Sequence, residues 1–172
     1  VSDGGGAVII TTEERARDLD VKPVYVLGAQ SGMTHWAIHQ MPDFTTTAAA
    51  KIAPRLFAEA GVTPADIDNA QLYDGFSPFV YLWLEGLGIV PRGQGLAFLR
   101  DGHGSLGGKL PINTGGGALG EGRLHGMTQL IESVLQVTDR AGERQVPGAS
   151  RAIATISNGL TKATGFIFSR DG

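Results

Sequence analysis

The chain has 172 residues, of which 42% are hydrophobic and 18% charged, so it can bury one core and fits the one-domain range of globular proteins. A net charge of −3 without any run of Lys or Arg argues against nucleic-acid binding, and no apolar run approaches the roughly 20 residues of a membrane span. The absence of Cys excludes disulfides, Cys-based zinc sites and a Cys nucleophile within these residues, and it fits a cytoplasmic location.

The N-terminal part is expected to alternate strand, helix and strand. Residues 7–12 are apolar and β-branched and predict a strand, and a short helix should follow as far as Leu19. Residues 18–23 form a boundary because Pro23 ends the preceding element. A second strand is predicted for residues 24–28.

A helix is the clearest expectation for residues 46–60, where apolar side chains recur at helical spacing and Gly61 follows as a C-cap. Residues 70–73 then read as a buried strand. After a turn, Ser77 is expected to cap a helix over residues 78–87.

Residues 91–122 are predicted to form a long glycine-rich loop, and loops of this length are usually functional. Helical spacing of apolar residues resumes over residues 124–138, and two β-rich segments, residues 151–157 and 163–169, close the chain. The order of elements predicts a mixed α/β fold that ends in a hairpin.

The motif G-x-G-x-x-G occurs at residues 115–120, but a dinucleotide site also needs a second strand with an acidic end about 20 residues on. Residues near 140 lie at a predicted helix end, so we interpret the match as chance. The loop is either a turn that lets the next helix pack closely or a functional site. Glycine amides ahead of a helix bind a carbonyl or an oxyanion well, which favours the functional interpretation.

Two histidines, His35 and His39, have the spacing of metal ligands on one helical face. Because no third ligand is evident and apolar residues surround them, packing or a substrate wall is the favoured interpretation. No metal site is predicted.

Three ordered segments resemble the C-terminal domain of thiolases, and specifically of their sterol-carrier or lipid-transfer relatives. Residues 73–77 (Tyr-Asp-Gly-Phe-Ser) follow residues 61–68 as the family's HDCFS or NEAF motif follows its AGlxpxDID segment. Residues 113–118, together with residues 122–126 at the end of the same loop, are similar to the family's NxxGG...GHPxGxxG loop. Residues 152–159 stand where thiolases carry LATLCIGGG.

The start of the chain also resembles a thiolase segment, the SDGAAA strand that closes the N-terminal domain. The resemblance implies that residues 1–21 end the N-terminal domain and that residues 22–172 form the C-terminal domain, an α/β thiolase-like fold with a mixed sheet between helix layers. The chain opens with Val1 rather than Met, which fits a fragment or a processed chain.

Departures from the family's pattern carry the functional prediction. Arg123 replaces the GHP histidine, and Ser157 replaces the C-terminal cysteine. An arginine stays protonated, and a serine without an adjacent base moves protons poorly, so Claisen condensation through an acyl-enzyme is not expected. Tyr73 stands where the family polarises the thioester carbonyl, and a phenol beside a cation such as Arg123 can donate a hydrogen bond or accept a proton.

This pattern resembles the lipid-transfer-type aldolases of bacterial steroid side-chain degradation. The resemblance implies retro-aldol cleavage of a steroid β-hydroxyacyl-CoA to a ketone and a short acyl-CoA, with no cofactor. It also implies a homodimer formed through the N-terminal half, and an OB-fold partner of the DUF35 type that would carry any zinc. The alternatives are an acyltransferase whose nucleophile lies in the N-terminal half, and a non-catalytic lipid or acyl-CoA binder.

The implied site has two groups of residues. Its catalytic residues are Tyr73, Arg123 and His125. Its substrate-binding residues are Asp74, Phe76, Asn113, Gly116, Gly117 and Ser157. For Tyr73 the alternative is a buried residue at a strand end whose hydroxyl bonds only to backbone.

Overall fold

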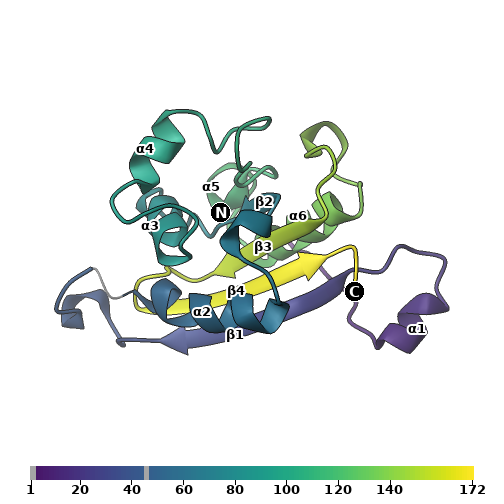
Figure 1. Ribbon diagram of the computed structural model, residues 1–172, viewed down its shortest axis with the longest axis horizontal. Helices are drawn as coiled ribbons and strands as arrows, with labels where there is room; N and C mark the ends of the chain where they lie inside the picture. The colour runs from purple at the N-terminus through teal and green to yellow at the C-terminus, as the bar shows by residue number, and fades with distance from the viewer. Residues whose placement is uncertain (1–2, 45–46) are drawn as a thin grey trace.

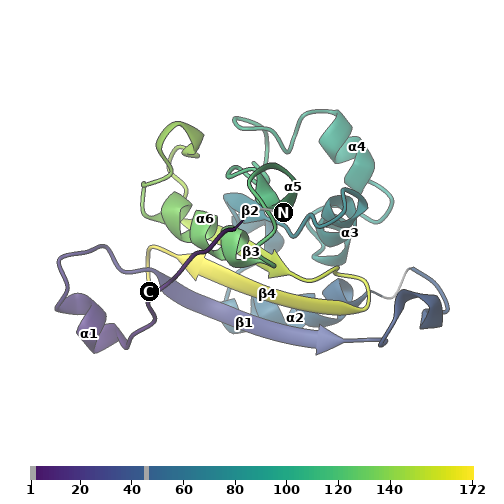
Figure 2. The same ribbon diagram turned by 180° about the vertical axis from the view of Figure 1, so that it is seen from behind.

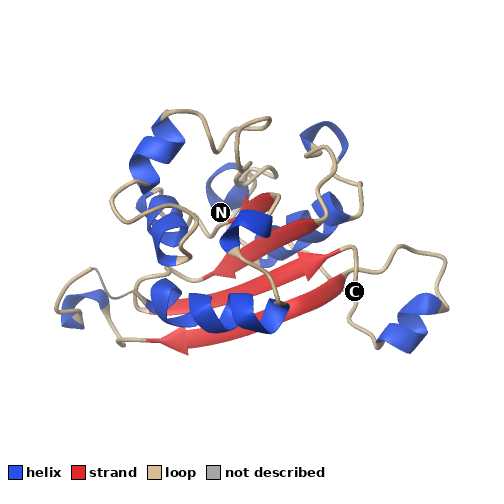
Figure 3. Ribbon diagram, viewed as in Figure 1, coloured by secondary structure: helices blue, strands red, loops and turns tan. Residues whose placement is uncertain are grey.

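A mixed four-stranded sheet is the centre of the fold in this computed structural model, which describes residues 3–44 and 47–172 (Figures 1 and 3). The strand order is β1-β4-β3-β2, with β4 antiparallel to both β1 and β3 and with β2 parallel to β3. The α/β class, the mixed sheet and the closing hairpin are therefore confirmed. The strands are β1 (Tyr25–Met33), β2 (Asn69–Gln71), β3 (Arg151–Ile156) and β4 (Lys162–Ser169).

Helices cover both faces of this sheet. Helix α2 packs on β1 and β4, whereas α6 packs on β3 and β2 from the opposite face, as Figures 1 and 2 show together. Helix α3 lies against α2 and α4. The α-helices are α1 (Glu13–Arg17), α2 (Ala48–Ala60), α3 (Pro78–Gly86), α4 (Gly95–Arg100), α5 (Gly117–Gly120) and α6 (Met127–Val137), and short 3-10 turns lie at Ile38–Gln40, Pro64–Asp66 and Gly142–Arg144.

Helix α2 forms where the sequence predicts it, although residue 46 itself lies outside the described residues. The Thr47 hydroxyl accepts a hydrogen bond from the Ala50 amide at 3.1 Å, and Gly61 ends the helix in the left-handed conformation. Ile52 and Leu56 are fully buried against the sheet. None of the helices in the described part combines the length and the apolar character that a membrane span requires.

Two strand predictions for the N-terminal part are wrong. Residues 7–12, which the structure describes, form no strand because no neighbouring strand pairs with them, and Ile9 and Ile10 are 94% and 87% exposed. The second strand extends well beyond residue 28, because its pairing with β4 continues to Met33.

In the middle of the chain, the corrections concern helix ends and two missed helices. The predicted loop over residues 91–122 contains α4 and α5, whose six and four residues are too few for a clear helical period. Ser77 precedes α3 but makes no side-chain capping bond, because its own backbone is already helical. Helix α6 begins at Met127, since positive backbone φ angles at residues 125 and 126 prevent an earlier start.

The close approach of α2 to the sheet depends on Gly28. A Cβ atom there would lie 2.8 Å from the Leu56 carbonyl oxygen and 3.2 Å from the Ala60 Cβ. We expect Gly28→Ala to lower the free energy of unfolding by about 1–3 kcal/mol, because helix backbone must move to accept the methyl group. Chemical denaturation measures this change. Gly5→Ala is the control, because a Cβ at Gly5 meets nothing within 4 Å, and an equal loss in the control would contradict the prediction.

Candidate active site at the carboxyl ends of β2 and β3

The predicted site residues follow neighbouring parallel segments at one edge of the sheet. The parallel register of β2 and β3 pairs Gln71 with Ala154, so Tyr73 and Ser157 both leave the sheet at its carboxyl edge. On the other side of β2, a parallel bridge joins Ala70 to Ile112, which brings Asn113 to the same edge. The carboxyl ends of strands are the usual place of ligand sites in α/β folds.

Tyr73 is held at both its backbone and its hydroxyl. Its amide donates a hydrogen bond to Thr155 Oγ1 at 2.9 Å, and the amide of the preceding Leu72 donates to Asn113 Oδ1 at 2.7 Å. The phenol oxygen accepts a hydrogen bond from Arg123 Nε at 3.3 Å, and the residue is 5% exposed. The hydroxyl thus contacts a guanidinium rather than backbone.

Asp74 is engaged by the glycine-rich loop. Its carboxylate accepts hydrogen bonds from the Ala118 amide at 2.7 Å, the Leu119 amide at 3.3 Å and Gln129 Nε2 at 3.2 Å. The residue is 3% exposed. This geometry does not support the predicted substrate contact of Asp74, because its buried carboxylate already holds α5.

The two predicted loop glycines differ in what their amides do. The Gly116 amide donates to the Asn113 carbonyl oxygen at 2.8 Å, so it closes the turn and is not open to a ligand. The Gly117 amide has no protein acceptor within residues 3–44 and 47–172. Gly117 has a φ of 62°, and a Cβ there would lie 2.4 Å from Asp74 Oδ2. Gly117 is buried, so its amide is a buried donor without a protein acceptor, in a backbone conformation that favours glycine.

Backbone strain gathers at the predicted site. Among the described residues, four residues other than glycine have a positive φ, and three of them are site candidates: Asn113 at 49°, His125 at 50° and Ser157 at 77°. Such conformations cost free energy and cluster at functional sites. The fourth, Asp139, follows the end of α6.

The remaining candidates lie nearer the surface. His125 is exposed. The next residue, Gly126, packs closely on Ile156, since a Cβ added at Gly126 would lie 2.5 Å from Ile156 Cγ1. Ser157 is half-buried, and its carbonyl oxygen accepts a hydrogen bond from Trp83 Nε1 at 3.3 Å. Phe76 is 62% exposed; its ring makes an edge-to-face contact with Phe79, and its carbonyl oxygen accepts a hydrogen bond from the Phe79 amide at 3.0 Å.

Sequence reasoning missed the side chains that support these residues. Thr155 and Gln129 bond directly to Tyr73 and Asp74. The available signal was the helical spacing of Gln129, Glu132 and Gln136, which gives α6 one polar face. In the part of the chain that the structure describes, no three His, Cys, Asp or Glu side chains lie close enough to hold a metal ion.

Comparisons with known proteins agree on one family. The sequence profile of thiolase C-terminal domain-like proteins matches residues 30–170. The chain is 36% identical over 164 residues to the 17-hydroxy-3-oxo-4-pregnene-20-carboxyl-CoA lyase of Mycobacterium tuberculosis, with 92% of this chain and 42% of that protein covered. It is 37% identical over 177 residues to a steroid side-chain-cleaving aldolase of Thermomonospora curvata, with 99% of this chain and 44% of that protein covered.

A solved structure shows the same fold. The Ltp2-ChsH2(DUF35) aldolase superimposes with a TM-score of 0.83 at 34% sequence identity, covering 91% of this chain and 42% of that chain. The chain spans less than half the length of these relatives.

Proposed function

This chain belongs to the thiolase C-terminal domain-like family, and we propose that it forms part of a lyase that cleaves a steroid β-hydroxyacyl-CoA by a retro-aldol reaction. The observation that carries the proposal is the contact between Tyr73 Oη and Arg123 Nε at 3.3 Å, at positions where thiolases use other side chains. The names of the two relatives, a lyase and an aldolase, support the same reaction class.

The proposed reaction uses Tyr73 to move one proton. Acting as the general base, the Tyr73 oxygen takes the proton of the substrate β-hydroxyl, the Cα–Cβ bond breaks, and the electron pair of that bond forms the thioester enolate. Tyr73 then returns the proton to Cα, which yields a ketone and a shorter acyl-CoA. Arg123 stabilises the phenolate charge, and the open Gly117 amide donates to the enolate oxygen.

We also propose that residues 1–21 end an N-terminal domain and that residues 22–172 form the C-terminal one. The extended, unpaired and exposed segment around Ile9 and Ile10 supports this, because an apolar strand of this kind is stabilised by pairing with another sheet. Gly6 lies against Met127 and Ile131, so the segment runs along the outer face of α6. The N-terminal half would supply the homodimer interface.

A DUF35-type protein is the proposed partner, because the solved relative is described as an Ltp2-ChsH2(DUF35) aldolase. The proposed reaction needs no cofactor, and we propose that any zinc belongs to that partner. The N-terminal domain and this partner would both be present in the active protein.

Product analysis tests the proposed function. The full-length protein, purified with its DUF35-type partner, is expected to convert a steroid β-hydroxyacyl-CoA into equal amounts of ketone and short acyl-CoA, measured by mass spectrometry. The same preparation should not condense acetyl-CoA. Condensation of acetyl-CoA without any cleavage of the β-hydroxyacyl-CoA would show that the protein is an acyltransferase instead.

A further inference from the structure

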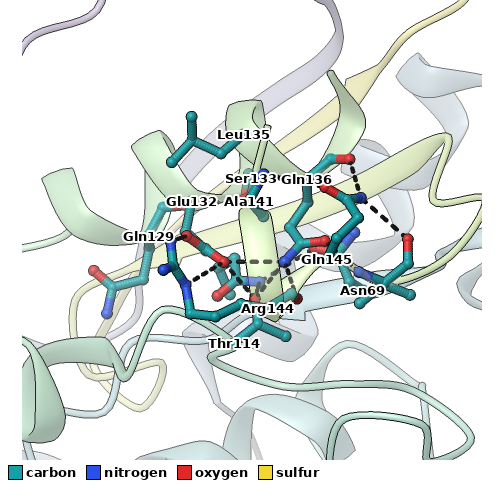
Figure 4. Close-up of polar contacts among 12 residues, drawn as sticks. Asn69, Thr114, Gln129, Glu132, Ser133, Leu135, Gln136, Ala141, Arg144 and Gln145 are labelled. Carbon is teal, nitrogen blue, oxygen red and sulfur yellow. Dashed lines mark hydrogen bonds and ion pairs between the residues drawn. The ribbon is translucent and has the colours of Figure 1, made fainter. Parts of the chain in front are cut away.

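Helix α6 buries its polar side. Gln129, Glu132 and Gln136 are almost completely buried, whereas Leu130 and Val134 on the same helix are only half-buried. A helix that only packs on a sheet buries its apolar face. The polar face of α6 points instead towards Thr114 in the glycine-rich loop, as the labelled side chains in Figure 4 show.

Glu132 is the charged centre of this face. Its side chain is 5% exposed, and its carboxylate accepts hydrogen bonds from Gln136 Nε2 at 3.0 Å and from Arg144 Nη2 at 3.0 Å (Figure 4). The hydrogen bond to Glu132, and then the charge of that carboxylate, raise the pKa of Arg144. Because burying a carboxylate is costly, a charge at this position needs these partners to persist.

The carboxylate acts on the loop through Thr114. The Thr114 hydroxyl donates to Glu132 Oε1 at 2.8 Å and accepts from Gln136 Nε2 and from Gln71 Nε2, each at 3.0 Å. All the bonding capacity of this hydroxyl is therefore used. The next residue, Gly115, lies directly on the carboxylate, since a Cβ there would be 3.1 Å from Glu132 Cδ.

From Thr114 the connection to Tyr73 is short. The preceding residue, Asn113, has a strained φ of 49° and binds the Leu72 amide through its side chain. The following turn places the Gly117 amide. A shift of Thr114 would therefore displace both the support of Tyr73 and the open donor of the loop.

We propose that Glu132 is a positioning residue, which fixes Thr114 and thereby the spacing between Tyr73 and the Gly117 amide. This inference rests on the proposed function for its kinetic effect. A purely structural ion pair would instead affect stability without a specific effect on the loop.

The test compares variants of α6 in the full-length protein with its partner. Glu132→Ala is expected to lower kcat for the β-hydroxyacyl-CoA by about 10- to 100-fold with KM changed less than about threefold, because the substrate still binds while the reacting groups are misplaced. Glu132→Gln keeps an acceptor for Thr114 and should recover most of that loss. Thr114→Val removes the hydroxyl with little change of shape and should reproduce the loss.

Val137→Ala is the matched control. Val137 is 1% exposed on the same helix, so its truncation lowers Tm without removing a polar contact to the loop. Its kcat is expected to stay within about twofold of the wild type. If Val137→Ala loses as much kcat as Glu132→Ala at the same loss of Tm, the positioning role is refuted.

Amide hydrogen exchange separates this inference from the proposed function, because it needs no substrate. Exchange within residues 114–121 should accelerate in Glu132→Ala and in Thr114→Val but not in Val137→Ala. Unchanged exchange in both Glu132→Ala and Thr114→Val would overturn the positioning role. A wild type that fails to cleave the β-hydroxyacyl-CoA would overturn the proposed function alone.

Discussion

Tyr73→Phe is expected to lower turnover of a β-hydroxyacyl-CoA by about 10²- to 10⁴-fold while the protein folds normally. The substitution keeps the ring, which is buried, and removes only the oxygen that contacts Arg123. Arg123 is exposed, so water can solvate its guanidinium when the phenol is absent and the loss of stability should be small. Steady-state kinetics and the Tm of the same preparations measure the two effects.

Ser157→Ala is the control for this prediction. In the thiolase pattern this position moves a proton, but within the described residues the hydrogen bond of Ser157 involves its backbone, whose carbonyl oxygen accepts from Trp83 Nε1. Its loss of turnover should therefore be far smaller than that of Tyr73→Phe. Near-normal cleavage by Tyr73→Phe together with an inactive Ser157→Ala would show that the proposed mechanism is wrong.

The sequence was sufficient to predict the α/β class, the closing hairpin and the main helices, because helical spacing persists over more than ten residues in α2 and α6 and two consecutive β-rich segments end the chain. It also identified the chain segments that meet at the carboxyl edge of the sheet. The contact between Tyr73 and Arg123, 50 residues apart, followed from the family's motifs rather than from any periodicity.

Other features depend on tertiary contacts that periodicity does not report. Residues 7–12 have the composition of a strand but no pairing partner within the described residues. Asp74 was predicted to contact substrate as part of the segment that resembles the family's HDCFS or NEAF motif, yet its carboxylate bonds to amides 44 and 45 residues away. The apolar residues of α6 revealed the helix, whereas the polar residues on its other face make the contacts to the site.

Gly117→Ala is expected to reduce turnover by at least about 10²-fold, the usual scale for losing one oxyanion donor. The methyl group would collide with Asp74 Oδ2, and the left-handed backbone at Gly117 disfavours any side chain by about 1–2 kcal/mol. Both effects move the turn and with it the Gly117 amide, the proposed donor to the enolate oxygen. Kinetics and Tm must be measured together, because the strain also lowers stability.

Two glycine controls separate the donor from the strain. Gly88 has a φ of 72°, and a Cβ there meets nothing within 4 Å, so Gly88→Ala carries the same kind of backbone strain outside the turn that holds Gly117. It should lower Tm and leave turnover unchanged. Gly120 lies within α5 with open space around its Cβ position, so Gly120→Ala should preserve both. If Gly88→Ala loses turnover in proportion to its Tm as Gly117→Ala does, the loop serves packing and the donor role of the Gly117 amide is excluded.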